Sequence, residues 1–301
     1  MTSRSSKNTL RGYETEIEKC REESNWKKAV DLAQQLKARS PQHESLANFL
    51  IGEGKLELYL DEWAPSKENI ERAQRELSDT RGYLTLATDE QGKKAGVALD
   101  AHLLLGKLHY ACGEYEDTLK NYKLAELSSL KEKELTVRSL RIVAESFAIK
   151  GLCLEQTDLP GSSSKFKQAE KEMETIRCYE QSSSLTLLYL QRAPAASAGA
   201  TLETAVQRVP ILHMRAGRLN CAVERYRELL MAEETPSMQN LRLTFTRQLA
   251  EVLLRGVTGE LYEPPNKSKG STTTRKKENP EGPWKPKKYS RLNQVRYNMI
   301  D

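Results

Sequence analysis

Residues 103–127 read LLLGKLHYACGEYEDTLKNYKLAEL, and this stretch decides the fold class of the 301-residue chain. Apolar residues recur at helical spacing from Val97 to Leu108, and a second helical set begins at Tyr115. Gly113 separates the two sets and suits the left-handed position that commonly follows a helix end. The stretch therefore predicts two helices joined by a tight turn.

The offsets within this helical hairpin are typical of residues that pack two helices closely together. Gly and Ala let helix axes approach, and aromatic side chains fill the space between neighbouring hairpins. The spacing resembles the tetratricopeptide repeat, a pair of antiparallel helices of ~34 residues. Thr118 stands where that repeat usually has Ala, and Tyr110 stands one place later than its usual Tyr. The residues that we assign to packing in this unit are Leu105, Gly106, Gly113, Tyr115, Tyr122 and Ala125.

Weaker copies of the unit occupy much of the remaining chain. The stretch GRLNCAVERYRELL repeats the offsets, with Gly217, Ala222 and Tyr226 as its packing residues. A helix expected over residues 139–155 has apolar residues on two faces, so it needs partners on two sides, as inside a solenoid. We therefore expect an all-α solenoid of tetratricopeptide-like helical hairpins, with about ten helices and almost no strand.

Composition divides the chain into three segments. We expect a disordered N-terminus over residues 1–12, a helical repeat domain over residues 13–262, and a basic, mostly disordered tail over residues 263–301. The charge is uneven along the chain. Residues 264–301 carry ten Lys and Arg against three Asp and Glu, so this end is +7 and the remainder is −2 within a formal net charge of +5.

The basic tail has three readings. It is a solvated linker, or a patch that approaches anionic lipid, or a segment that binds nucleic acid through stacked aromatic rings. Nucleic acid is the least favoured of the three, because three aromatics in the tail are few and the helical body is not basic. The lipid reading rests on Lys276, Lys277, Lys285, Lys287 and Lys288.

Signatures of catalysis and of metal binding are missing from the sequence. No phosphate-binding loop, dinucleotide fingerprint, HExxH or GxSxG string occurs. The acidic residues are expected mainly on solvated helix faces, paired with Lys and Arg three or four residues away. The five cysteines and four histidines are scattered without ligand spacing, and the cysteines suit buried positions in a reducing compartment. We therefore predict a protein that is not an enzyme and has no cofactor, no metal and no catalytic residue.

The ends of the chain carry no apolar segment that would act as a signal peptide or a membrane span. The first twenty residues, MTSRSSKNTLRGYETEIEKC, lack the apolar core of a secretory signal. No run approaches the ~20 apolar residues that a transmembrane helix needs. A cytoplasmic location is the default expectation.

Several longer strings resemble the tetratricopeptide repeat protein 7 family, in that family's order. They include ETEIEKCREESNWKKAVDLAQQL, RIVAESFAIKGLCLE and GRLNCAVERYRELLMAEETPSMQNLR, and they contain positions that a helical hairpin does not dictate. Members of that family are longer, and this chain is similar to their N-terminal portion. The resemblance implies a scaffold that holds phosphatidylinositol 4-kinase type III alpha at the plasma membrane, together with a hyccin-type protein and a palmitoylated membrane anchor.

Two other functions compete with this adaptor reading. A co-chaperone of the tetratricopeptide class grips the terminal carboxylate of a partner with Lys and Asn on its first helices. In the unit at 103–127 those places hold Leu103 and Lys107, so the Asn is missing. An enzyme whose site assembles only in three dimensions is the third hypothesis, and a deep polar pocket with perturbed titratable groups would support it.

Overall fold

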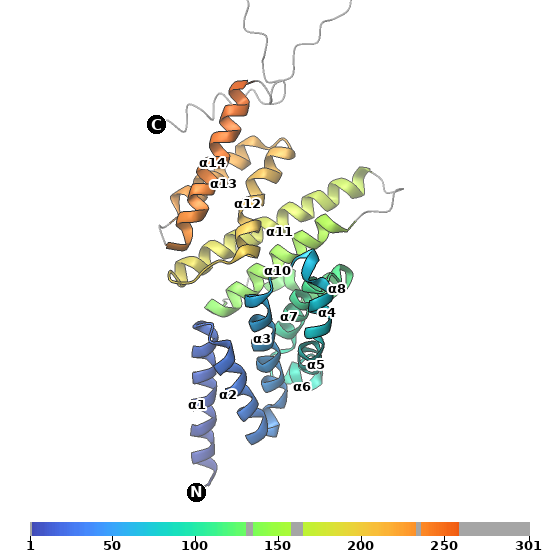
Figure 1. Cartoon of the computed structure of the whole chain (residues 1–301), viewed down its shortest axis with the longest axis vertical. Helices are drawn as coiled ribbons and strands as arrows, with labels where there is room; N and C mark the ends of the chain where they lie inside the picture. The colour runs from blue at the N-terminus through green and yellow to red at the C-terminus, as the bar shows by residue number, and fades with distance from the viewer. Residues whose placement is uncertain (1, 131–134, 158–164, 233–235, 259–301) are drawn as a thin grey trace, which may run out of the picture. The chain divides into compact units, whose positions relative to one another are not determined.

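In the computed structural model, the described residues are 2–130, 135–157, 165–232 and 236–258. Every regular element in these ranges is a helix, which confirms the all-α class (Figure 1). The α-helices are α1 (Thr2–Glu22), α2 (Trp26–Arg39), α3 (Glu44–Glu62), α4 (Ile70–Glu76), α5 (Ser78–Leu86), α6 (Glu90–Lys94), α7 (Ala98–Ala111), α8 (Tyr115–Leu124), α9 (Leu127–Leu130), α10 (Val137–Gln156), α11 (Lys165–Arg192), α12 (Ala200–Arg215), α13 (Leu219–Met231) and α14 (Pro236–Thr258). Two short 3₁₀ helices, η1 (Pro41–His43) and η2 (Lys67–Asn69), precede α3 and α4.

The helices form two compact units, where the sequence predicted one continuous repeat domain. Unit 1 contains residues 1–193 and 198–205, and unit 2 contains residues 194–197 and 206–301. The division falls within α12, whose first residues belong to unit 1 and whose remainder belongs to unit 2. None of the helices in the described ranges combines the length and the apolar composition that crossing a bilayer requires.

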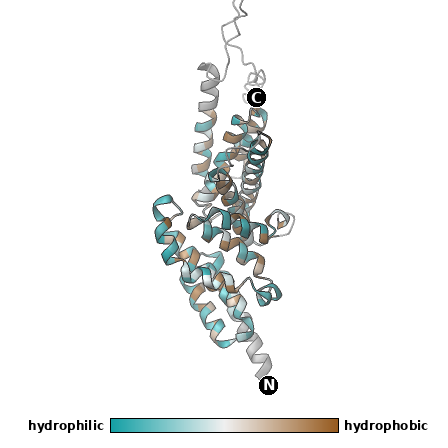
Figure 2. Ribbon diagram, turned by 90° about the vertical axis from the view of Figure 1, so that its right-hand side faces the viewer, coloured by the Kyte–Doolittle hydropathy of each residue, from teal (hydrophilic) through white to brown (hydrophobic). Residues whose placement is uncertain are grey.

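Unit 1 is an array of four helical hairpins. Their first helices are α1, α3, α7 and α10, and their second helices are α2, α5, α8 and α11. Each second helix also packs on the first helix of the next hairpin: α2 on α3, α5 on α7 and α8 on α10. The helices carry hydrophobic and hydrophilic residues side by side (Figure 2), and the buried apolar residues of α1 through α10 form one continuous core cluster. A helix within the array therefore packs on two sides, as a helix with two apolar faces requires.

Glycines on the first helices set how closely the two helices of a hairpin pack in the third and fourth hairpins. A Cβ atom built on Gly106 of α7 would lie 2.4 Å from the Tyr122 ring of α8, which is nearer than real atoms approach. A Cβ atom on Gly151 of α10 would lie 2.9 Å from the Tyr179 ring of α11. The glycine and the tyrosine therefore form one packing unit, which recurs in consecutive hairpins.

The turn after α7 has the predicted geometry. Gly113 has φ +76°, in the left-handed region that favours glycine. The amide of Glu114 donates to the carbonyl of His109 at 2.9 Å, and the amide of Gly113 donates to Tyr110 at 3.0 Å, which together end the helix in a Schellman arrangement.

Unit 2 repeats the same devices. Gly217 has φ +74° and joins α12 to α13, where the amide of Arg218 donates to the carbonyl of His213 at 2.8 Å. Tyr226 of α13 lies edge-on to Phe245 of α14, with the ring centroids 6.3 Å apart.

The structure differs from the sequence expectations at the N-terminus. The first helix begins at Thr2, where the sequence predicted disorder over residues 1–12. The first residues of this helix are polar, which is why the sequence predicted disorder. The helix nevertheless continues without a break into the segment that packs on α2. The basic tail at 263–301, with its five lysines, lies outside the described residues.

Candidate functional site

The most unusual feature of unit 1 is a line of eight charged side chains on the first helices of its four hairpins. We call it the ionic ladder. Its members alternate in sign and run in the order Glu18, Arg21, Glu53, Arg138, Glu57, Lys107, Glu145, Arg141. Four are anionic and four are cationic, so the ladder is neutral.

Each neighbouring pair of the ladder is within hydrogen-bond distance. Arg21 donates to Glu53 at 2.6 Å, and Glu53 accepts again from Arg138 at 2.9 Å. Arg138 also donates to Glu57 at 3.0 Å. The remaining contacts are Glu18–Arg21 at 2.6 Å, Lys107–Glu57 and Lys107–Glu145 at 2.7 Å each, and Arg141–Glu145 at 3.0 Å.

Helical periodicity aligns the members that share a helix. Glu53 and Glu57 are four residues apart and so lie on one face of α3. Arg141 and Glu145 are likewise four apart on α10, and Arg138 lies one turn before them. Helix α7 contributes Lys107, next to the Gly106 that brings α8 close. The tight stacking of the hairpins therefore brings these faces together.

The centre of the ladder is buried. The side chains of Glu53, Arg138, Glu57 and Glu145 are 1%, 4%, 5% and 7% exposed, whereas Glu18 at one end is 44% exposed. Charges in such a place are stable only when they are paired and hydrogen-bonded. The expectation that acidic residues lie on solvated helix faces is therefore wrong for these three glutamates.

Neighbouring cations favour the ionised form of all three buried glutamates, because they lower the pKa of each. Burial alone would raise the pKa of Glu57, but Lys107 and Arg138 outweigh burial and lower this pKa to about 2. Burial opposes ionisation of Glu53 as well, and Arg138 and Arg21 lower its pKa. The pKa of Glu145 is lowered mainly by Lys107 and Arg141, again against burial.

Aromatic rings cover the three arginines of the ladder. The guanidinium carbon of Arg138 lies 4.7 Å from the ring centre of Trp26, that of Arg21 lies 5.6 Å from Phe49, and that of Arg141 lies 5.9 Å from Tyr189. These contacts add cation–π attraction to the ion pairs. A guanidinium suits such sites because it can stack on a ring while its edge donates to carboxylates.

The ladder bears directly on the co-chaperone hypothesis. A carboxylate clamp needs a free cation on the first helix, but the Lys107 ammonium is already held by two carboxylates of this chain. Leu103, at the other clamp position, is fully buried. The geometry therefore argues against capture of a terminal carboxylate at this unit.

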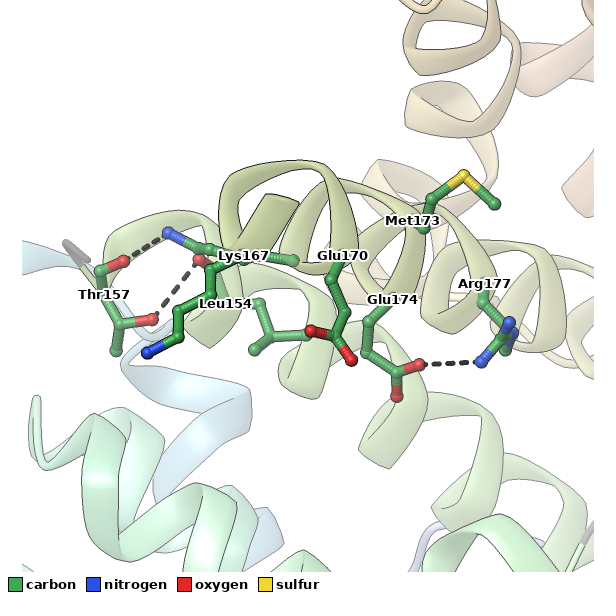
Figure 3. A pocket seen from close by; sticks show the side chains of 8 residues that line it. Leu154, Thr157, Lys167, Glu170, Met173, Glu174 and Arg177 are labelled. Atoms are coloured by element: carbon green, nitrogen blue, oxygen red, sulfur yellow. Dashed lines mark hydrogen bonds and ion pairs between the residues drawn. The ribbon is translucent and has the colours of Figure 1, made fainter. Parts of the chain in front are cut away.

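A separate groove of about 590 Å³ lies where the end of α10 meets α11 (Figure 3). Three of its polar side chains have partners: Glu174 accepts from Lys150 at 2.7 Å and from Arg177 at 3.1 Å, and Lys171 donates to the carbonyl of Thr157. The hydroxyl of Thr157 donates to the carbonyl of Leu154 at 3.3 Å. The eight residues that line the groove are Leu154, Thr157, Lys167, Glu170, Lys171, Met173, Glu174 and Arg177.

One side-chain cluster at the α7–α8 turn has metal-ligand chemistry. The ligand atoms of His109, Glu114 and Asp117 lie within 4.8 Å of one another. However, Arg81 donates to both carboxylate oxygens of Glu114 at 2.9 Å, and His109 also contacts that carboxylate. A cation would have to displace Arg81, so we assign this cluster to fastening α5 to the turn.

The cysteines are free thiols and most are buried. Burial raises the pKa of Cys153 and of Cys178 to about 12 each. A thiol with so high a pKa is a poor nucleophile near neutral pH, because the thiolate is the reactive form.

Of the nine packing residues predicted from sequence, Gly113 and Tyr115 are half-buried, Gly217 is exposed and the other six are buried. Leu105, Tyr122, Ala125, Ala222 and Tyr226 are all buried. Ala125 follows the last residue of α8 rather than lying within it, and Tyr115 opens α8 with its ring 5.9 Å from Tyr110.

The ladder itself was missed by sequence reasoning. Its signal is a charged residue inside an apolar helical run, as in FLIGEGKLEL around Glu53 and LLLGKLH around Lys107. A charge in such a run is either buried with a partner or marks a narrow solvated strip, and only the fold distinguishes these cases.

Comparison with known proteins agrees with this architecture. The family model described as "Tetratricopeptide repeat protein 7 N-terminal" matches residues 1–297. "Tetratricopeptide repeat protein 7B" of Homo sapiens is 37% identical over 269 residues, covering 83% of this chain and 32% of the relative. The protein of the same description from Mus musculus is 37% identical over 280 residues, covering 85% and 33%. "Tetratricopeptide repeat protein 7A" of Homo sapiens is 28% identical over 292 residues, covering 84% and 34%. The chain thus spans about a third of the length of these relatives.

Proposed function

The chain belongs to the tetratricopeptide repeat protein 7 family, and from that membership we propose that it is an adaptor of a phosphatidylinositol 4-kinase complex at the plasma membrane. The family and the helical-repeat fold point to a non-enzymatic scaffold. A stacked array of hairpins suits this role because it offers a long, rigid surface to large proteins.

The proposed partners are phosphatidylinositol 4-kinase type III alpha, a hyccin-type protein and a palmitoylated membrane anchor. They follow from the resemblance of the chain to its family. Plasma-membrane recruitment through these partners is part of the same proposal, and it requires no lipid-spanning helix in this chain.

Family membership carries the proposal, and the pairing of buried charge in unit 1 agrees with it. The ladder pairs its own cations and anions, so it is suited to internal fit rather than to turnover of a substrate. The remaining exposed helix faces are then available to protein partners.

Co-expression with each candidate partner tests the proposal. We expect the tagged chain to retain the kinase or the hyccin-type protein through purification at moderate salt. A matched variant is Gly106→Leu, which overpacks the contact with Tyr122. It should disrupt the packing of the hairpin and, as a result, no longer retain the partner.

Two results would contradict the proposal. Loss of every candidate partner, from a chain that circular dichroism shows to be helical, would exclude the adaptor role. Phosphorylation of phosphatidylinositol by the purified chain alone would instead exclude the non-enzymatic role.

A further inference from the structure

The ionic ladder connects hairpins that are not neighbours in the array. Arg138 of α10, in the fourth hairpin, donates to Glu53 and Glu57 of α3, in the second, across 85 and 81 residues. The same guanidinium stacks on Trp26, at the start of the second helix of the first hairpin. In an ordinary helical repeat each unit contacts only its neighbours, so no contact between distant units restricts bending of the array.

Buried ion pairs add long-range connections to the apolar core that the hairpins share. Helix α1 places Ile17 and Cys20 in the buried interior, and it packs along α2. Its connection to α3 in the next hairpin includes Arg21, which donates to Glu53 through both Nε and Nη2, at 2.6 and 3.1 Å. Because Glu53 also accepts from Arg138, one buried carboxylate joins α1, α3 and α10.

We propose that the ionic ladder is a conformational lock that holds the four hairpins of unit 1 as one rigid body. It fixes the angle between hairpins and so presents a preformed surface to a protein partner, which lowers the ordering cost of binding. Alternating buried charges suit this task because they reward a single register, whereas apolar contacts tolerate sliding. The inference concerns rigidity and goes beyond the proposed function, since it holds whichever partner binds.

Hydrogen exchange of the full chain, followed by mass spectrometry, tests the lock. Arg21→Met removes the half-buried cation near the α1 end of the ladder and keeps a stem of similar length, while Glu53 retains Arg138. We expect exchange in residues 13–22 of α1 to rise by about tenfold or more, with α7, α10 and α11 unchanged. Arg21→Lys keeps the charge and should retain most of the protection.

A second variant acts at the centre of the ladder. Arg138→Met should release α1 and α3 together, while the contact between α10 and α11 keeps its protection. The matched control is Arg177→Met, which removes an exposed partner of Glu174 on α11 and should leave α1 unchanged.

Three results would overturn the lock. The first is unchanged α1 exchange in Arg21→Met. The second is equal opening in Arg21→Met and Arg21→Lys, since that would assign the effect to stacking of the guanidinium on Phe49 rather than to charge. The third is a uniform rise over all helices of unit 1 in Arg21→Met, which would indicate a loss of global stability instead of a local release. Because Arg21 lies at the ladder's outer end, its pair of variants decides the question even if Arg138→Met fails to fold.

Discussion

At the scale of single residues, glycine and tyrosine act as complementary shapes across a helix contact. Gly106 and Gly151 each face the ring of a buried tyrosine, so the missing side chain on one helix is the space that the ring occupies on the other. Sequence reasoning identified Gly106 and Tyr122 as repeat positions, and the structure supplies the reason for the pairing.

Replacing Gly106 with Ala measures this fit. The new Cβ atom would lie 2.4 Å from the Tyr122 ring, and the tyrosine cannot withdraw because it is fully packed. We expect a loss of ~1–3 kcal/mol in the free energy of unfolding, seen as a lower melting temperature by circular dichroism.

Gly82→Ala is the matched control for this substitution. Gly82 lies within α5, and a Cβ atom there would meet nothing within 4 Å. Ala should therefore stabilise the helix by ~0.5–1 kcal/mol. If both substitutions shift the melting temperature in the same direction, the close-packing account of Gly106 is wrong.

At the scale of elements, three of the first helices combine an apolar face with a charged face. One face of α3, α7 and α10 is apolar and enters the core, and another carries the ladder. The glutamates of the ladder have depressed pKa values, so folding of these helices is linked to pH. Glu57 faces Lys107 on α7 and both Arg138 and Arg141 on α10, and Asp61 follows it on its own helix.

The sign of the pH dependence follows from Glu57. Its pKa is about 2 in the folded chain and ~4.3 in an unfolded one, so the unfolded chain binds the proton more readily. The stabilising contribution is complete above pH ~4.3 and is lost as the pH falls toward 2. Thermal unfolding followed by circular dichroism should therefore show a steep fall in melting temperature over that window.

A substitution assigns this fall to the ladder. Glu57→Gln should unfold at lower temperature at pH 6, because it leaves Lys107 and Arg138 with less buried negative charge, at a cost of ~3–5 kcal/mol. It should also show a shallower decline below pH 4.3. Glu76→Gln, at an exposed pair with Arg72, is the control and should follow the parent chain. Identical acid profiles for Glu57→Gln and the parent would contradict the linkage.

At the scale of the whole molecule, the charge is divided between a nearly neutral helical body and a basic end. We propose that the tail at residues 263–301 contacts anionic lipid once the helical body is brought to a membrane. Each positive residue close to such a surface contributes about 1 kcal/mol, and the attraction weakens as salt screens it.

Charge reversal tests the tail. Glu in place of Lys276, Lys277, Lys285, Lys287 and Lys288 should abolish most binding of the chain to vesicles that contain phosphatidylserine, and added salt should weaken binding of the parent chain in the same sedimentation assay. Equal binding of the parent to neutral and anionic vesicles would leave the tail as a solvated linker.

The sequence by itself determined the helical class, the hairpin at 98–124 and the turn at Gly113. These features are encoded within short windows, because helical periodicity, helix ends and left-handed turns depend on residues that are close along the chain. The same windows identified Gly106 and Tyr122 as packing residues, since their spacing belongs to one repeat. They did not reveal the helix over residues 2–12, whose polar composition resembles that of a disordered segment.

The division into two units and the ionic ladder were decided only by the tertiary structure. Glu53 and Arg138 are 85 residues apart, and a charge on a helix has the same sequence pattern whether it meets water or a partner from another hairpin. Which of these it meets depends on how closely the hairpins stack and at what angle. Those quantities are set by side-chain packing between helices that are distant in sequence, so no local pattern contains them.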